Sequence, residues 1–428
     1  MANRSNSANT CHIPLKDEEQ MNGSHDPVRH LKYLRQSLSQ DNESIGFFIS
    51  AGCPLSVEMA ENEWPLIPDV ANLTIFINQQ LKENKKYSLL LEELGKAEKN
   101  IENIEDILSF LRSLLLVSKG GNVRGLSEND LLDLQKLICQ EIVTKLNVTL
   151  PNNETPYHRL CKWIGSIDRK MAIELFTTNY DLLLEQALEN LEIPYFDGFV
   201  GSNKSFFDLR AVEDNLIPVH WSRLWKIHGS INWYEENHSG KKKVYRSSDV
   251  KTDASHLIYP SHLKYEESRK MPYLALIDQL NRFIRKKSSF LILCGYSFND
   301  GHLNDAIVNA LKANPTAMVL GLMFDTYEKI GGDGKLIERY PDAYKLAQNQ
   351  HNLNIWTFDK AVIGTNLGNW NLLLNKDESA IDLLSFVQSE KSDHPESTKY
   401  LVKLGDFSIF TNFLKKIIGI SKEDLNVK

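Results

Sequence analysis

The chain of 428 residues lacks most of the features that mark specialised protein classes. No two cysteines form a C-x-x-C pair, because the five are scattered at Cys11, Cys53, Cys139, Cys161 and Cys294. A disulfide framework or a Cys₄ zinc site is therefore not expected, and a reducing compartment fits best. No apolar run approaches the roughly 20 residues of a membrane-spanning helix, and the N-terminus has no apolar core of the kind a signal peptide needs. We expect a soluble, cytoplasmic protein with no bound metal and no membrane partner.

Positive charge is also scarce. The chain has 49 Lys and Arg against 56 Asp and Glu, so its formal net charge is −7. This balance gives no global attraction to nucleic acid, and we do not expect this chain to bind nucleic acid directly on its own. The sequence contains neither a G-x-G-x-x-G nor a Walker A motif, so any nucleotide site must use another signature. The one basic run, from Gly240 to Arg246, predicts a solvated turn.

An apolar content of 42% is enough for a proper core. Short apolar runs, each followed by a polar loop and then by helical spacing, predict buried strands at residues 45–49, 172–176, 290–294, 317–322 and 353–358. Repeated units of strand, loop and helix favour an α/β fold with a doubly wound, parallel, Rossmann-like sheet.

We divide the chain into three parts. Residues 1–26 are polar and predict a disordered tail. Residues 27–365 form the α/β domain, which begins with a helix at 28–38 and carries a helical insertion at about 71–148 that could serve as a lid or as an assembly surface. Residues 366–428 form a packing or oligomerisation tail with a final helix near 413–418.

The loop Thr177–Asp181 lies where a predicted strand gives way to a predicted helix. Open α/β sheets place their ligand chemistry at such carboxyl ends of strands. Asp181 can cap the helix by accepting from the amides of its first turn. Asn179 has no such structural duty, and its amide can hold a sugar hydroxyl or a water.

Two further turns have small or polar residues after a predicted strand. Ser50 to Pro54 could let backbone amides approach a phosphate, although a tight turn explains the same residues equally well. In the second turn, Tyr296 and Ser297 follow Gly295, and packing and turn formation are the alternatives for them. Asp325 follows the next strand and is a weaker candidate for a sugar hydroxyl.

Four motifs stand in a fixed order, namely Ser50-Ala51-Gly52-Cys53, Thr177-Thr178-Asn179-Tyr180-Asp181, Ile227-His228-Gly229 and Gly295-Tyr296-Ser297. This order resembles the sirtuin superfamily. The longer stretches around the last three motifs look like the bacterial sirtuin-like branch used in antiphage defence. The resemblance covers roughly residues 28 to 360.

The chain also departs from the sirtuin pattern, and these departures are as informative as the matching motifs. Sirtuin deacylases carry a structural zinc module on paired cysteines, which this chain lacks. Ile67-Pro68-Asp69 looks like the deacylase turn, but Val70-Ala71 follows where the family has Phe-Arg. Without that aromatic cover, hydrolysis of NAD⁺ is a better expectation than transfer to an acyl-lysine.

The resemblance implies an NAD⁺ glycohydrolase that cleaves NAD⁺ to nicotinamide and ADP-ribose and depletes NAD⁺ to abort phage infection. It implies that Asn179 holds the water or a ribose hydroxyl and that His228 is the general base. A buried imidazole paired to a backbone carbonyl is the structural alternative for His228. The predicted contacts to NAD⁺ are Ala51, Gly52, Cys53, Asp69, Thr178, Asp181, Gly295, Tyr296, Ser297 and Asp325.

A chain that ends soon after the sirtuin-like region resembles the stand-alone subunit that works beside a HerA-type ATPase. We therefore expect a homo-oligomer with a HerA-type ATPase, a DNA translocase, as its partner. Two other functions stay open: a non-catalytic subunit that senses NAD or a related nucleotide, and an NAD-dependent protein deacylase. The sequence does not separate NAD⁺ from NADP⁺, and no cluster of metal-binding carboxylates predicts nuclease activity.

Overall fold

The computed structural model describes residues 23–238, 241–250, 256–258, 272–373, 378–391 and 398–418. Most of the predicted N-terminal tail lies outside these residues. Its last part was predicted wrongly, because Ser24–His25 form strand β1, which pairs with β19 (Asn366–Trp370) at the edge of the central sheet.

The central sheet has ten strands in the order β1-β19-β18-β17-β14-β13-β2-β5-β9-β6. Its middle strands run parallel and are β17 (Leu353–Trp356), β14 (Met318–Leu322), β13 (Phe290–Cys294), β2 (Ile45–Ile49), β5 (Glu174–Thr177) and β9 (Ser222–Lys226). After β2 the chain builds one side through β5 and β9, and then returns to build the other side through β13, β14 and β17. The predicted doubly wound, mainly parallel α/β sheet is confirmed. The order reverses at β2, where such sheets bind ligands.

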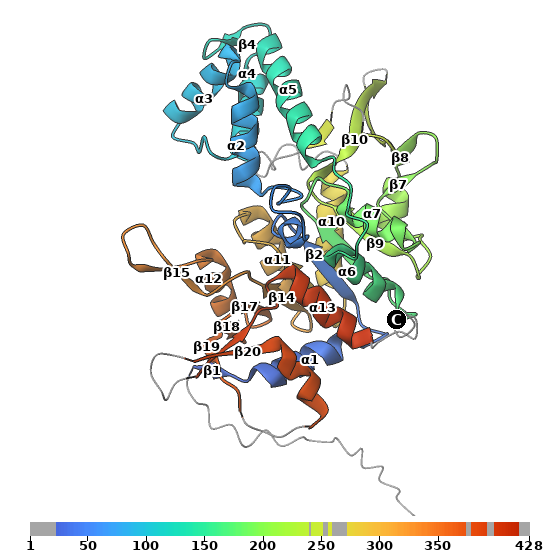
Figure 1. Ribbon diagram of the computed structural model, residues 1–428. Helices are drawn as coiled ribbons and strands as arrows, with labels where there is room; N and C mark the ends of the chain where they lie inside the picture. Colours follow the sequence, from blue (N-terminus) through green and yellow to red (C-terminus); the bar gives the residue numbers. More distant parts are fainter. Residues whose placement is uncertain are drawn as a thin grey trace, which may run out of the picture.

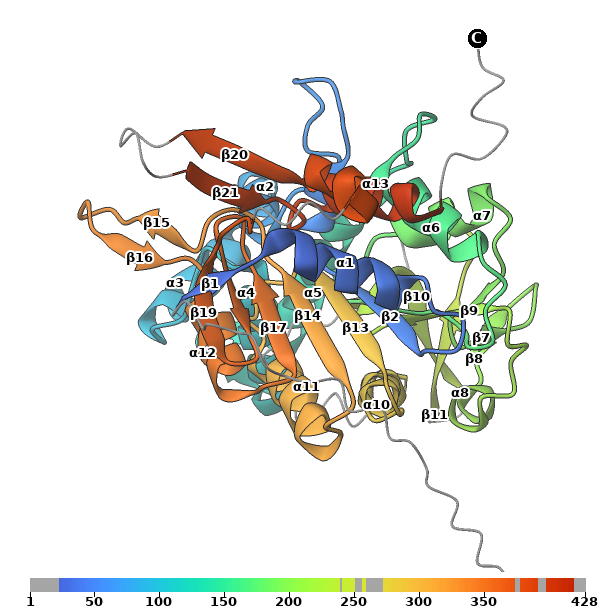
Figure 2. The same ribbon diagram turned by 90° about the horizontal axis from the view of Figure 1, so that it is seen from below.

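Helices cover both faces of this sheet (Figure 2). One face packs against α1 (Pro27–Leu38), α6 (Pro156–Gly165) and α13 (Phe407–Ile418), and the other against α10 (Tyr273–Ile284), α11 (Gly301–Ala313) and α12 (Pro341–Asn349). Each face of the sheet has its own hydrophobic core. Successive residues of β2 pack into opposite cores, with Phe47 and Ile49 on the first face and Phe48 on the second. Burial on both faces explains why β2 is apolar throughout.

Four helices form a separate block at the end of the sheet (Figure 1). They are α2 (Val70–Leu81), α3 (Lys85–Lys96), α4 (Ile104–Val117) and α5 (Glu128–Leu146). Their apolar residues recur at helical spacing and meet in a shared core that includes Ile77, Leu90, Leu111 and Ile138. Side-chain caps begin each helix, with Asn103 accepting from the amide of Glu105 at the start of α4.

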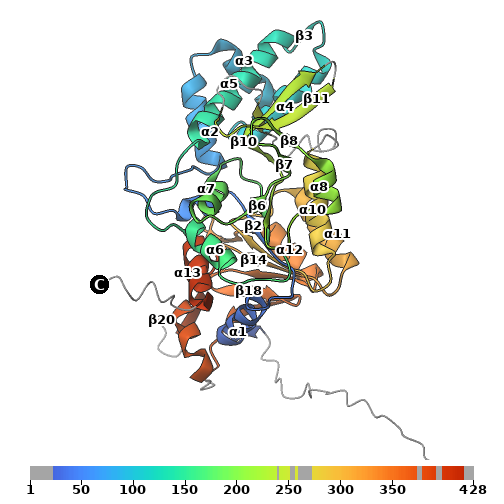
Figure 3. The same ribbon diagram turned by 90° about the vertical axis from the view of Figure 1, so that its right-hand side faces the viewer.

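A second sheet of five strands lies beside the helical block (Figure 3). Its order is β12-β10-β11-β8-β7, with β10 at Gly229–His238 and β11 at Lys241–Arg246. The predicted solvated turn was therefore wrong for Lys241–Arg246. Pairing with β10 outweighs the basic composition, because Tyr245 stacks on Tyr234 and Arg246 pairs with Asp197 at 2.6 Å.

The C-terminal segment returns to the central sheet. The 3₁₀ helix η3 (Glu378–Phe386) leads into a hairpin of β20 (Val387–Lys391) and β21 (Thr398–Val402). Helix α13 then begins at Phe407 rather than near Phe413, because Asp406 accepts from the amide of Ser408 at 2.8 Å. Within the described parts of the chain, no helix has the length and apolarity needed to cross a membrane.

Candidate active site

A cavity of about 240 Å³ opens at the carboxyl ends of β2, β5 and β13. Its floor is formed by turns after these strands, and its cover by the helical block through Val70, Leu73, Asn103, Glu105 and Leu146. The remaining lining residues are Ser50, Ala51, Pro54, Ile67, Pro68, Thr178, Asn179, Tyr180, Asp181, His228, Tyr296, Ser297, Asn299 and Asp300. The cavity thus joins segments from both halves of the sheet and from the insertion.

The turns after β2 and β13 are bound to each other through their backbones. The amide of Ser50 donates to Cys294 O at 3.0 Å, and the amide of Gly52 donates to Gly295 O at 3.1 Å. A Cβ on Gly295 would lie 2.7 Å from the backbone nitrogen of Cys53, and Gly295 has φ of +67°. Glycine is required here because two backbones touch.

The loop Thr177–Asp181 is tied to the first of these turns. The hydroxyls of Ser50 and Thr178 are hydrogen-bonded at 2.7 Å, and Asn179 Nδ2 donates to Ser50 O at 3.3 Å. The backbone N–H of Asn179 donates to Thr177 Oγ1 at 3.0 Å. These contacts hold the half-buried Asn179 side chain at the cavity wall.

Asp181 is buried at the start of α7 (Leu183–Asn190) and accepts from the amide of Leu183 at 3.0 Å, so the sequence-predicted role at the helix start is present. Burial raises the pKa of Asp181, and the nearby Lys226 ammonium opposes that rise. Lys226 is itself buried at the end of β9, where it donates to the Asp181 carbonyl and, at 2.7 Å, to Glu185 Oε1. This lysine therefore fixes the loop that carries Asn179.

His228 lies between β9 and β10, where the amide of the preceding Ile227 donates to Thr177 O at 2.8 Å. The imidazole is buried at the cavity wall, with its ring centroid 6.4 Å from that of Tyr180. Its Nε2 lies 3.5 Å from Oδ2 of Asp300, the residue that begins α11. Asn179 and His228 therefore line one cavity although they come from different strands.

The structure brings seven of the twelve predicted site residues to the cavity, namely Ala51, Thr178, Asn179, Asp181, His228, Tyr296 and Ser297. Three others, Gly52, Cys53 and Gly295, do not line it but form the backbone contact beneath it. Burial raises the pKa of the Cys53 thiol, as expected for a packing residue. Asp69 does not line the cavity, and its carboxylate instead caps α2 by accepting from the Asn72 amide at 2.8 Å.

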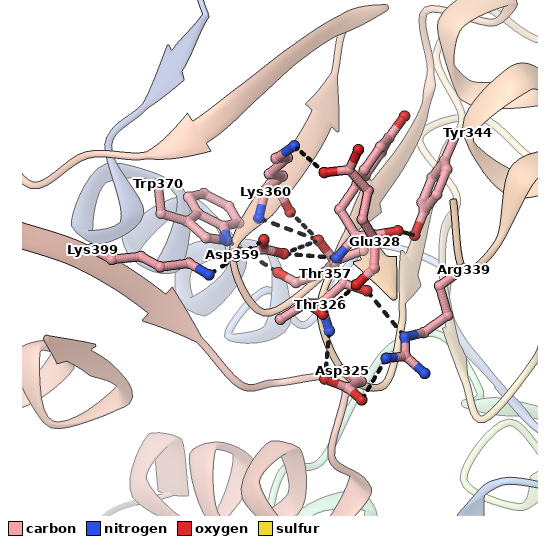
Figure 4. Close-up of polar contacts among 11 residues, drawn as sticks. Asp325, Thr326, Glu328, Arg339, Tyr344, Thr357, Asp359, Lys360, Trp370 and Lys399 are labelled. Atoms are coloured by element: carbon pink, nitrogen blue, oxygen red, sulfur yellow. Dashed lines mark hydrogen bonds and ion pairs between the residues drawn. The ribbon is translucent and has the colours of Figure 1, made fainter. Parts of the chain in front are cut away.

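Asp325 does not line the cavity. Figure 4 shows its polar contacts. It was chosen because it follows a strand, but the chain there turns into a hairpin of β15 (Glu328–Ile330) and β16 (Leu336–Glu338). Its carboxylate pairs with Arg339 at 2.9 Å and accepts from the Thr326 amide at 2.7 Å. In this structure the Asp325 carboxylate therefore stabilises the start and the end of the hairpin through Thr326 and Arg339.

The sequence did not single out several lining residues. Asp300 follows a strand and begins a helix, which is the same capping signal that marked Asp181, so it could have been found. Asn103 and Glu105 could not, because only the packing of the insertion brings α4 to the sheet. Among the described residues, no group of three or more His, Cys, Asp or Glu could hold a metal ion.

A doubly wound α/β sheet with a cavity at its switch point is typical of the Rossmann-like folds, many of which bind nucleotides there. Within this class, residues 173–345 match the family model of the SIR2-like domain, so this part of the chain is sirtuin-like. The match includes Asn179, His228 and Asp300. SIR2-like domains bind NAD⁺ and are often NAD-utilising enzymes. No curated protein matches the chain significantly.

Proposed function

We propose that this protein hydrolyses NAD⁺ to nicotinamide and ADP-ribose in the cavity described above. The observation that carries the proposal is that Asn179 and His228 line one cavity, within the part of the chain that matches a SIR2-like domain. An amide and an imidazole supply a positioning group and a base, which are the two functions that hydrolysis of a glycosidic bond by water requires.

The charge of the lining favours the nicotinamide end of NAD⁺. Glu105, Asp181 and Asp300 line the cavity, while none of the lining residues is Lys or Arg. Carboxylates attract the cationic pyridinium ring and the positive charge that develops on the ribose, but they repel phosphates. A volume of about 240 Å³ is below the roughly 300–1,000 Å³ of typical ligand sites. We therefore expect the cavity to enclose the nicotinamide riboside end and the pyrophosphate to lie outside it.

In the proposed reaction the bond between the ribose C1′ and the nicotinamide nitrogen breaks, and its electron pair returns to the pyridine ring. The oxygen of a water bonds to C1′, and His228 takes the proton that this water loses. Asn179 holds the water or a ribose hydroxyl through its amide. The products are nicotinamide, ADP-ribose and one proton, so atoms and charge balance.

The cellular role that we propose is depletion of NAD⁺ in antiphage defence, in the cytoplasm. An unregulated enzyme of this kind would harm its own cell, so we further propose control by assembly, as a homo-oligomer that works with a HerA-type ATPase. Size-exclusion chromatography with light scattering, with and without such an ATPase, tests this part. A monomer that ignores the ATPase would contradict it.

The activity itself is tested by incubating the purified protein with NAD⁺ or NADP⁺ and measuring nicotinamide and ADP-ribose by chromatography. The assay is run with the protein alone and with a HerA-type ATPase. Loss of the base His228 in His228→Ala is expected to lower turnover by about 10²- to 10⁴-fold, and Asn179→Ala should also be strongly impaired. The matched control is His351→Ala, because His351 is exposed and does not line the cavity.

Two results would redirect the proposal. Equal nucleotide binding by the wild type and Asn179→Ala, with turnover in neither, would favour a non-catalytic nucleotide sensor. Release of acetyl-ADP-ribose from an acetylated peptide would instead indicate a deacylase.

A further inference from the structure

The two carboxylate oxygens of Asp300 have different partners. Oδ1 accepts from the amides of His302 at 3.1 Å and Leu303 at 3.3 Å, which are in the first turn of α11. Oδ2 lies 3.5 Å from His228 Nε2. The helix end therefore fixes the plane of the carboxylate and directs its second oxygen toward the imidazole.

The beginning of α11 is itself rigidly held. Tyr296 OH donates to Asn304 Oδ1 at 2.8 Å, and Asn304 Nδ2 donates to Phe298 O at 2.7 Å. Both side chains come from the turn after β13 or from the first turns of the helix, and both are buried. Asp300 is therefore presented to His228 by a fixed structure rather than by a mobile loop.

The pair is shielded from solvent. The His228 and Asp300 side chains are 8% and 11% exposed, respectively, so salt screens their interaction little. A separation of 3.5 Å is longer than the roughly 2.7–3.2 Å of a good hydrogen bond. Such contacts are often long without substrate and shorten when it is bound.

We infer that Asp300 is a positioning residue for His228. It keeps a proton on Nε2, so that Nδ1 is the nitrogen that accepts a proton, since a neutral imidazole donates from one nitrogen and accepts at the other. It also stabilises the imidazolium that forms when His228 takes a proton. This inference rests on the proposed hydrolysis and assigns within it a residue that the sequence did not single out.

Other ionisable groups also line this cavity. They are Glu105 on α4, Asp181 at the start of α7, and the phenols Tyr180 and Tyr296. Asp181 already has Lys226 beside it, whereas Oδ2 of Asp300 lies 3.5 Å from His228 Nε2. Asp300 is therefore the group whose charge we expect to act most directly on the imidazole.

The test uses Asp300→Asn and Asp300→Ser. Both residues are good helix N-caps, so each can keep the bonds to the first turn of α11 while it removes the carboxylate charge that faces His228. Asp208→Asn is the matched control, since Asp208 caps α8 (Leu209–Asp214) by accepting from the Ala211 amide and does not line the cavity. Full-length proteins with ¹³C-labelled histidines are titrated by NMR, and the His228 signal is assigned by its loss in His228→Gln.

The titration midpoint of His228 is expected to fall by about one pH unit or more in both Asp300 variants and to stay unchanged in Asp208→Asn. In the NAD⁺ assay, kcat is expected to fall about 10- to 100-fold with little change in KM, and the acid limb of the rate profile to move to lower pH. An unchanged His228 midpoint in folded Asp300 variants would overturn the inference. A wild type that does not cleave NAD⁺ would overturn the proposed function, while the midpoint shift would still show that Asp300 acts on His228.

Discussion

At the scale of single residues, the contact between Gly52 and Gly295 decides whether the cavity floor can form. Gly295 has φ of +67° and would place a Cβ 2.7 Å from the Cys53 backbone nitrogen. Gly295→Ala should therefore combine the cost of a left-handed alanine, about 1 kcal/mol, with an overpacking cost of about 1–3 kcal/mol. We expect a loss of about 2–4 kcal/mol in urea unfolding, together with a loss of NAD⁺ turnover.

Gly120 provides the control for this variant. It has φ of +71°, but a Cβ there would meet nothing within 4 Å. Gly120→Ala should thus show the left-handed cost alone and keep its turnover. If the two variants were equally stable, close packing at the turn would not be the reason for the glycine.

Lys226 is the buried cation beneath the cavity, with Glu185 Oε1 at 2.7 Å. Lys226→Met leaves that carboxylate without its cation and is expected to cost about 3–5 kcal/mol. Burial raises the pKa of Glu185, and Lys226 opposes the rise. Without the lysine, the folded state holds a proton more tightly than the unfolded state does, so the stability of the variant should fall as pH rises above the ordinary range of a glutamate.

Urea unfolding of Lys226→Met at pH 5 and pH 8 measures this loss. The double variant Lys226→Met/Glu185→Gln removes the carboxylate that pairs directly with the lysine and should recover part of the stability. The pH dependence that remains is expected to come from Asp181, which is buried and also interacts with Lys226. A double variant as unstable as the single one would show that packing of the lysine stem, rather than its charge, is what matters.

The sequence was informative about the residues of the cavity floor because each lies at a strand end, where the apolar pattern stops. Asn179 was identified in this way, whereas His228 was predicted from the resemblance of Ile227-His228-Gly229 to a sirtuin motif, and both residues line the cavity. Asp325 satisfied the same rule but does not line the cavity, because a strand end does not determine where the following loop turns. Glu105 lies inside an ordinary helical pattern, so only tertiary packing reveals it.

At the scale of secondary-structure elements, the helical block has a defined part in the site. Its residues Asn103 and Glu105, at the start of α4, line the cavity opposite the sheet. A carboxylate there should stabilise the cationic end of NAD⁺, so Glu105→Gln is expected to lower kcat/KM about 10-fold. Steady-state kinetics measure this effect, with Glu102→Gln as the control because Glu102 is exposed and does not line the cavity. Equal kinetics for both variants would leave the block without an electrostatic role.

The edge of the central sheet holds a cluster of aromatic rings around His30 of α1. Its ring centroid lies 6.1 Å from Trp356 and 6.2 Å from Trp370. Burial, with smaller contributions from the charges of His25 and Arg29, lowers the pKa of His30 from 6.5 to about 4. The unfolded chain therefore binds the proton first as pH falls, and stability should decrease between about pH 6.5 and pH 4.

Because of His30, the free energy of unfolding is expected to be about 2 kcal/mol lower at pH 5 than at pH 7. His30→Gln should lose less stability than the wild type over that interval, although it begins lower because ring packing is lost. Urea midpoints at the two pH values measure the difference, and His351→Gln is the exposed control. If the wild type and His30→Gln lost the same stability between pH 7 and pH 5, groups other than His30 would be responsible for the acid destabilisation.

The elements of the central sheet were predictable because burial on both faces produces continuous apolar runs. The second sheet was not, because its strands follow no such run. Lys241–Arg246 is basic and joins β10 only through tertiary pairing. Local composition predicted a turn there, but pairing with β10 makes this segment a strand.

At the scale of the whole molecule, the cavity exists only when distant parts of the chain are folded together. It takes residues from the turn at Ser50, the helix at Asn103, the loop at Asn179, the strand end at His228 and the helix start at Asp300. A ligand that touches all of them binds the folded state alone. NAD⁺ should therefore stabilise the entire domain rather than a single loop.

His228→Ala allows this linkage to be measured without consuming the ligand. At an NAD⁺ concentration about 100 times its Kd, the free energy of unfolding should rise by about 2.7 kcal/mol, which corresponds to an increase of a few degrees in Tm. Thermal unfolding of His228→Ala is followed at increasing NAD⁺, with nicotinamide alone and ADP-ribose alone as comparisons. Because the lining carries Glu105, Asp181 and Asp300 and no lysine or arginine, NAD⁺ should stabilise more than ADP-ribose does. Equal stabilisation by ADP-ribose would mean that the cavity does not recognise the cationic end, and the charge argument for the proposed reaction would fail.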